Sequence, residues 1–414
     1  MIHNILLSIW HNKIRTSLIL LLLIISYFLC FLSFTNGFSF TTHINKVKEK
    51  FSVDTKDIYI VSAYNIEDTD NFGNDITEIK KYVNRKDECT AGAYDIVKSN
   101  LYEELESNQD FINLNMVAYA NSSMAAYPKS VSVLFIDPEL TELLSTEFEP
   151  NNFEPVTKDG EIYQPMYIGR DFDGIINKGD ILTDSYSHIK YIIKGVVTDE
   201  EWFADDDPVT LSMTSLNHMF VVPFTEKDMM DSSIQLPTLG KLFIKCDTDT
   251  ANQFLEMSTQ KNMKLGIITV DSYIKKWKDM YGDILNQNIF LAVVVSVCSA
   301  ISIISVLCVS VILKKKEYGI RIAFGSSMNQ ILLSYAIEMI MLNIISAGIA
   351  FALCYNNYAS HTLDSFRSIH LTTLCTYSLC FLLLVMIIMV LIVLLIPSIL
   401  MLRYQPAILI KEEE

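Results

Sequence analysis

The sequence predicts a membrane protein with four transmembrane helices and a mixed α/β domain inserted between the first and the second helix. Two observations carry this prediction. Half of the residues are hydrophobic, and they gather in four stretches that hold almost no charge, at 16–40, 289–313, 331–355 and 371–402. The remainder of the chain has the charged, acidic composition of a soluble domain.

Each apolar stretch is long enough to cross a bilayer, because a transmembrane helix needs roughly 20 mainly apolar residues. We assign the transmembrane helices to 16–37, 289–313, 331–355 and 371–402. The first helix is too long for the apolar core of a cleaved signal peptide, which runs roughly 7–15 residues. One charged side chain lies inside the four stretches, Glu338. Because a carboxylate is costly in hydrocarbon, Glu338 either contacts other helices or reaches the membrane boundary.

Basic residues predict the orientation, because short loops rich in Lys and Arg stay in the cytoplasm. They cluster before the first helix, in 314–330 and in the tail 403–414: Lys13, Arg15, Lys314, Lys315, Lys316, Arg321, Arg403 and Lys411. The loop 356–370 contains a single Lys or Arg residue, Arg367. Both termini are therefore expected in the cytoplasm, with 38–288 and 356–370 outside.

Helical periodicity predicts three further features. Hydrophobic residues in 1–15 repeat at helical spacing, which is typical of an amphipathic helix in the membrane interface. The same spacing follows the first transmembrane helix and precedes the second, at Phe40, Ile44, Val47, Ile274, Trp277 and Tyr281. We expect these segments to form a paired helical stalk at both ends of 38–288, although two ordinary surface helices would show the same pattern.

Between these segments the sequence favours mixed α and β structure. Strand-like runs rich in β-branched residues lie at 57–62, 131–136, 191–197 and 242–245. Helical patterns lie at 93–106, 138–144 and 250–261.

The sequence contains no pattern for catalysis or nucleotide binding. It lacks a phosphate-binding loop, a Gly-x-Ser-x-Gly nucleophile turn and a His-Glu-x-x-His zinc motif. We therefore expect no enzyme activity, cofactor or metal in this chain. The acidity of 38–288 argues against nucleic acid as a partner. Cys89 and Cys246 are the two cysteines of this segment, and their spacing leaves open whether they form a disulfide.

The segment 314–330 is the most informative part of the chain. Its run Lys-Glu-Tyr-Gly-Ile-Arg-Ile-Ala-Phe-Gly over 316–325 resembles a motif of MacB/FtsX-like permeases of ABC transporters. Glu338 lies where that family commonly has a glutamate. Weaker similarities lie at 8–16, at Pro397 with 403–407, and within 38–288 at 167–170, 178–180, 193–197 and 222–223. Phe324, where leucine is usual, and residues 327–329 depart from the pattern.

The resemblance implies a permease subunit that couples a separate cytoplasmic ATPase to movement of a MacB-like extracytoplasmic domain (mechanotransmission). The coupling residues it indicates are Lys316, Glu317, Gly319, Ile320, Arg321, Ala323 and Gly325. ATP and Mg²⁺ would be bound by the ATPase. The other implied partners are membrane lipid and a second permease, identical or similar, in a bacterial inner or plasma membrane. Export or extraction of peptides, drugs or lipids is the expected function. A membrane-anchored receptor or sensor, or a regulator of cell-wall hydrolases, is the alternative.

Overall fold

The computed structural model describes residues 13–66, 72–121, 128–148, 150–197, 200–203, 211, 213–224, 241–361 and 364–403. The chain divides into two compact units. The helical unit comprises Met1–Thr42, Met280–Leu363 and Arg367–Glu414, and the sheet unit comprises His43–Asp279 with Asp364–Phe366. The predicted interfacial helix over 1–15 lies almost wholly outside the described residues, as does the tail motif after Arg403.

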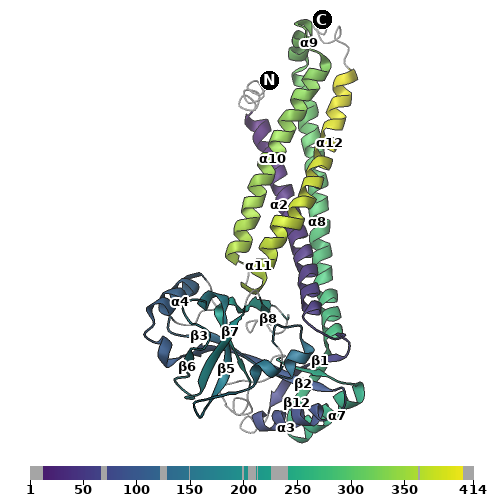
Figure 1. Cartoon of the computed structure of the whole chain (residues 1–414). Helices are drawn as coiled ribbons and strands as arrows, with labels where there is room; N and C mark the ends of the chain where they lie inside the picture. The colour runs from purple at the N-terminus through teal and green to yellow at the C-terminus, as the bar shows by residue number, and fades with distance from the viewer. Residues whose placement is uncertain are drawn as a thin grey trace. The chain divides into compact units, whose positions relative to one another are not determined.

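Four helices in the described part of the chain are long and apolar enough to span a membrane. In Figure 1 they are the long ribbons labelled α2, α8, α10 and α12. Their bounds, with those of the shorter helices of this unit, are α2 Lys13–Glu49, α8 Val270–Leu313, α9 Lys315–Ala323, α10 Met328–His361, α11 Asp364–Thr373, a π-helical turn Leu374–Ser378 and α12 Leu379–Arg403. The chain is therefore a multi-pass membrane protein with a mixed α/β region between its first two long helices.

Helix α2 is the most buried of the four long helices. One face of α2 joins an apolar cluster with residues of α8 and α10, among them Ile19, Leu23, Phe31, Ile303 and Met339. Helices α8 and α12 keep much of their apolar surface exposed, as expected of helices that face lipid.

The sheet unit is built on one ten-stranded mixed sheet with the order β12-β1-β11-β2-β3-β10-β5-β7-β6, where β4 pairs with β5. The pairs β3–β10 and β5–β7 are parallel, and the others are antiparallel. The strands are β1 Ile58–Ile66, β2 Thr90–Asn100, β3 Val131–Ile136, β4 Val156–Lys158, β5 Glu161–Gly169, β6 Ile181–Thr183, β7 Lys190–Val197, β10 Met219–Pro223, β11 Leu242–Lys245 and β12 Met263–Thr269.

A second sheet of two strands pairs β8 Glu201–Phe203 with β9 Met213–Ser215. The helices of the sheet unit are α3 Phe72–Asn84, α4 Gln109–Asn121, α5 Leu140–Leu143 and α7 Thr248–Gln260. Helix α7 begins where Asp247 accepts a hydrogen bond from the backbone N–H of Thr250, a usual N-cap arrangement.

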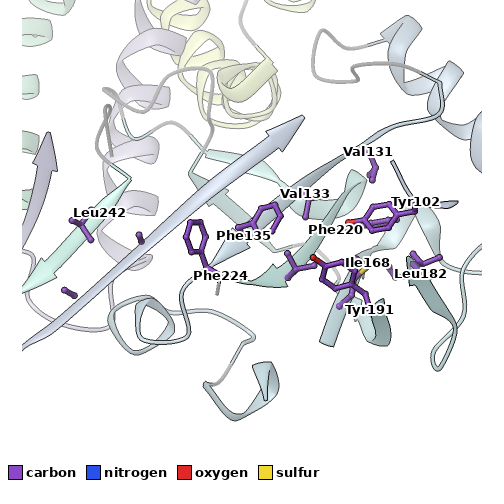
Figure 2. Packing of buried hydrophobic residues seen from close by; sticks show 14 of the residues in the cluster. Tyr102, Val131, Val133, Phe135, Ile168, Leu182, Tyr191, Phe220, Phe224 and Leu242 are labelled. Atoms are coloured by element: carbon purple, nitrogen blue, oxygen red, sulfur yellow. The ribbon is translucent and has the colours of Figure 1, made fainter. Parts of the chain in front are cut away.

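The core of the sheet unit lies along neighbouring strands. Figure 2 shows Val131, Val133 and Phe135 of β3 in a row, with the Phe220, Ile168 and Tyr191 side chains of β10, β5 and β7 beyond them. Glycine is required at two close approaches beside this core. A Cβ atom on Gly92 would lie 2.6 Å from the backbone nitrogen of Leu140, and one on Gly169 would lie 2.3 Å from the carbonyl oxygen of Asn217.

The segments predicted as a stalk are helical, as parts of α2 and α8. Within the helical unit, the rings of Phe40 and Tyr281 are 5.9 Å apart. Within the sheet unit, His43 contacts Trp277 with ring centroids 5.1 Å apart, and Lys48 lies 3.8 Å from Asp271. The end of α2 therefore packs on the start of α8; whether they stand out from a membrane as a stalk stays a prediction.

The four strands expected from sequence coincide with β1, β3, β7 and β11, and the helix expected at 250–261 coincides with α7. The helix predicted at 93–106 is wrong. Residues 90–100 form strand β2, and only Glu103–Leu105 make a short 3-10 turn. Strand β2 pairs with β11 on one side and β3 on the other, so its hydrogen bonds are satisfied by the sheet.

Candidate coupling site in the helical unit

Six of the seven coupling residues predicted from sequence lie on α9, a short helix between α8 and α10, and Gly325 follows it. Glu317 lies in its first turn and Arg321 in its last, which is the favourable order of charge for the helix dipole. The two side chains form an ion pair, with Arg321 Nη2 2.5 Å from Glu317 Oε1. Both are about half exposed, so the pair orders this surface without adding much stability.

Gly325 ends α9. Its φ of +93° lies in the left-handed region, where a side chain is strained, and glycine is the usual residue at this position after a helix. The N–H groups of Gly325 and Ser326 donate to the carbonyl oxygens of Ile322 and Arg321. This geometry reverses the chain sharply, so that α10 can begin at Met328.

The outward face of α9 is apolar at its centre. Ile320 and Phe324 lie four residues apart, hence on the same face, and the Phe324 side chain is 89% exposed. Ala323 is exposed as well. Ile320, Ala323 and Phe324 thus form a small exposed apolar surface beside an ordered ion pair, a combination that also occurs where proteins bind one another.

The inward face of α9 is anchored by Tyr318, which is buried together with the adjacent Gly319. The Tyr318 hydroxyl is hydrogen-bonded to the hydroxyl of Tyr335 on α10, and the two rings are 6.1 Å apart. The Tyr335 hydroxyl lies 3.5 Å from Ser310 Oγ on α8. One side chain of α9 is thereby linked to both neighbouring helices.

Arg15 of α2 completes this buried polar cluster. Its Nη1 donates to Ser310 Oγ at 2.7 Å, and its Nη2 forms an ion pair with Glu338 of α10. Both charged side chains are about nine-tenths buried. This contact favours the interpretation of Glu338 as a contact between helices over that of a side chain at the membrane boundary. Removing one member of a buried pair leaves an uncompensated charge, so the pair constrains α2 against α10.

Lys314 lies at the edge of this cluster, between α8 and α9. Burial, and then the positive charge of Arg15, lower the pKa of its ammonium group, while Glu317 and Glu338 act in the opposite direction. The cluster Arg15, Ser310, Tyr318, Tyr335 and Glu338 with its neighbour Lys314 thus joins α9 to α2, α8 and α10.

The structure brings most of the predicted coupling residues onto one short element. Glu317 and Arg321 pair with each other, Ile320 and Ala323 face outward, and Gly319 is buried. The side chain of Lys316 lies outside the described part of the structure. Sequence analysis missed Arg15, Ser310, Tyr318 and Tyr335 as a cluster. A signal was available for Arg15. It directly precedes the uncharged stretch 16–40, and a carboxylate inside the membrane, such as Glu338, needs a cation nearby.

The predicted cysteine pair lies in the sheet unit. Cys89 directly precedes β2 and Cys246 directly follows β11; both are free thiols. They line the same cavity, of about 460 Å³. Among the described residues, no group of three or more His, Cys, Asp or Glu side chains is arranged to hold a metal ion.

A protein-family model matches the part of the chain that holds this site apart from Arg15. Residues 289–406 match the model of the FtsX-like permease C-terminal family. This match supports a relation of this region to the FtsX-like permease family and suggests an ABC-transporter-type permease. Such permeases are generally non-enzymatic transporter subunits that work with a cytoplasmic ATPase. No curated protein is similar enough to the whole chain to count as a match. The matched region contains α9, α10, α11 and α12 with Ser310 and Glu338, and it begins after Asp279, where the main part of the sheet unit ends.

Proposed function

We propose that this chain is the permease subunit that couples ATP hydrolysis by a separate cytoplasmic ATPase to movement of the 38–288 segment outside the membrane. One observation carries the proposal: α9 presents an exposed apolar face, and on its other side a buried polar cluster joins it to three long helices. A displacement of α9 would therefore act on α2, α8 and α10 together.

The outward face of α9 suits an ATPase. Phe324 and Ile320 offer an apolar centre, and the Glu317–Arg321 pair offers a charge of each sign beside it. An aromatic anchor surrounded by polar groups is the usual composition of a binding hot spot. In this proposal ATP and Mg²⁺ are bound by the partner, because the sequence has no phosphate-binding loop of its own.

Movement rather than passage of a solute is the mechanism that the helical unit favours. Polar side chains within its long helices are bonded to one another: Tyr27 to Asn343, Ser26 to Ser296 and Thr35 to Ser378. A hydrophilic path would require polar groups directed at water or substrate. Helices α2 and α8 each continue from the helical unit into the sheet unit, so they would transmit the motion.

The remaining parts of the proposal follow from the ABC-permease context. Both termini and α9 would lie in the cytoplasm of a bacterial cell, two permeases would assemble with two ATPase subunits, and the exposed apolar faces of α8 and α12 would contact lipid or the second permease. The cargo would be a peptide, an amphiphilic drug or a lipid that is exported or extracted.

Co-purification tests this proposal. The full chain is isolated from its native membrane in nanodiscs, and the ATPase activity of the co-purified proteins is measured. Wild type is compared with Phe324→Ser, Glu317→Lys and Gly325→Trp. The matched control is Ile162→Ser, which removes an apolar side chain that is also largely exposed, from β5 of the sheet unit.

We expect an ATPase to accompany the wild type and the control, and to be lost or uncoupled in the three α9 variants. If no ATPase accompanies the wild type, or if Phe324→Ser retains it as fully as Ile162→Ser does, α9 is not the docking element. A membrane-anchored receptor or sensor would then be the better hypothesis.

A further inference from the structure

Cys89 directly precedes strand β2, and Cys246 directly follows the neighbouring strand β11. Strands β2 and β11 are antiparallel, with Ala91 opposite Ile244 and Thr90 opposite Lys245. One further step in this register places Cys89 opposite Cys246. Successive side chains alternate between the two faces of a strand, so both cysteines share the core-facing side with Ala91 and Ile244.

The backbone hydrogen bonds show whether the two cysteines occupy a hydrogen-bonded or a non-hydrogen-bonded pair of positions. The N–H of Tyr94 donates to the carbonyl of Lys241, which makes these facing residues a hydrogen-bonded pair. Such pairs alternate with non-hydrogen-bonded ones along an antiparallel ladder, and Cys89 lies an odd number of steps away. In agreement, the N–H of Cys246 donates to Asp57 on the opposite neighbouring strand, and that of Cys89 donates to Lys86.

Non-hydrogen-bonded pairs bring the two backbones closest. Their Cα atoms are typically about 4.5 Å apart, and a disulfide requires Cα atoms roughly 4.4–6.8 Å apart. The typical spacing of such a pair therefore falls within the range that a disulfide requires. The thiols are close enough that Cys89 contributes to raising the pKa of Cys246, after the larger effect of burial.

The two thiols differ in access. Cys246 is 7% exposed, whereas Cys89 is only partly buried beside the core. Both border the cavity of about 460 Å³, which Lys86, Asp87 and Thr250 also line. A small reagent can thus reach Cys89 first, with Cys246 behind it.

We propose that Cys89 and Cys246 are a cross-strand disulfide site, closed by exchange with a small-molecule disulfide such as oxidised glutathione. The Cys89 thiolate attacks one sulfur of the reagent and expels one glutathione thiolate. The Cys246 thiolate then attacks the Cys89 sulfur and expels the second glutathione thiolate. The two protons of the protein thiols end on the two released glutathiones, which are reduced as the cysteine pair is oxidised.

The bond would join the two ends of a long chain segment, because β3 to β10 all lie between Cys89 and Cys246 in the sequence. Cross-links that close long segments restrict the unfolded chain most. Oxidation is therefore expected to stabilise the sheet unit. A supply of disulfide oxidants in the cell rests on the proposed function, which places this unit outside the cytoplasm.

The test uses the purified full chain in detergent, treated with oxidised glutathione, alkylated and digested for mass spectrometry. We expect one linked peptide pair that contains Cys89 and Cys246, and an apparent Tm higher by roughly 5–10 °C in the oxidised form. Cys246→Ser should retain glutathione on Cys89. Cys380→Ser, which removes a cysteine of α12, should leave the linked pair unchanged.

The proposal is overturned if glutathione remains on Cys89 of the wild type, or if both cysteines are recovered as alkylated thiols. A separate arm exposes intact, reduced cells to a maleimide that cannot cross membranes. If Cys89 is not labelled there although the purified protein forms the linked pair, the disulfide site stands and the proposed orientation fails.

Discussion

The two units contain buried charged clusters of opposite composition. In the helical unit two cations, Arg15 and Lys314, lie near one carboxylate, Glu338. In the sheet unit two carboxylates, Asp137 and Glu139, lie near one cation, Lys80, at the wall of a cavity of about 390 Å³.

The consequences for protonation mirror each other. Burial and the charge of Arg15 lower the pKa of Lys314. Burial, and then the hydrogen bond with Glu139, raise the pKa of Asp137 to about 8, although Lys80 lowers it. Desolvation also acts to raise the pKa of Glu139, but its hydrogen bond with Asp137 and the charge of Lys80 bring it below its usual value. The helical cluster is therefore an ion pair that holds helices together, whereas the sheet cluster holds a proton that it can lose near neutral pH.

Glu338→Gln should cause the largest loss of stability among the substitutions in these two clusters. It leaves Arg15 and Lys314 without their carboxylate, and the loss of one member of a buried pair costs about 3–5 kcal/mol. Urea unfolding of the full chain in detergent measures this change. Glu317→Gln is the control, because its ion pair is half exposed and contributes about 0.3–0.5 kcal/mol. Equal effects of the two substitutions would show that the buried ion pair does not stabilise the contact between the helices.

Asp137→Asn should abolish a pH dependence of stability. The pKa of Asp137 is raised in the folded state, so its stabilising contribution is complete below pH 4 and is lost as the pH rises through about 8. Between pH 6 and pH 8 the free energy of unfolding of the wild type should fall by about 2 kcal/mol. The variant, which stays neutral, should show no such fall in the same titration; a parallel fall would assign the effect to another group.

Glu139→Gln should move that transition rather than remove it. The change deletes the neighbouring negative charge that helps to raise the pKa of Asp137, and leaves Lys80 in place. The midpoint of the stability loss should therefore shift to lower pH, measured as apparent Tm against pH. An unchanged midpoint would mean that the two carboxyl groups do not share the proton.

Lys314→Gln should have the smallest effect. It removes the surplus cation and keeps the Arg15–Glu338 pair. The free energy of unfolding, measured by urea unfolding, should therefore rise or stay within about 0.5 kcal/mol of the wild-type value. A loss as large as that of Glu338→Gln would show that Lys314, and not Arg15, is the principal partner of Glu338.

Sequence analysis located the elements whose residues carry a strong local pattern. The β-branched runs of β3 and β11 appear at the residues expected, and the long apolar helices follow from their lack of charge. Residues 93–100 of β2 were mistaken for part of a helix. The absence of a side chain at Gly92 is required by the close approach of Leu140, and no local pattern reports this contact between residues far apart in the chain.

The coupling site could be predicted only in part for a similar reason. The α9 residues form a contiguous motif, so a resemblance could identify them. The cluster behind them joins Arg15 to Glu338 across 323 positions, and no local pattern reports such a contact. The cysteine pair became specific only when the register of β2 and β11, extended by one residue, placed Cys89 opposite Cys246.

The central position of α2 also has a consequence for biosynthesis. Tyr27 bonds to a residue 316 positions later, and Thr35 to one 343 positions later. A ribosome therefore releases α2 into the bilayer long before α10 and the last helical segment exist. Until they arrive, these hydroxyl groups have no permanent partners in the hydrocarbon, where an unsatisfied polar group is costly. Chains truncated before α10 should consequently be recognised as unfinished and degraded by membrane proteases faster than the complete protein.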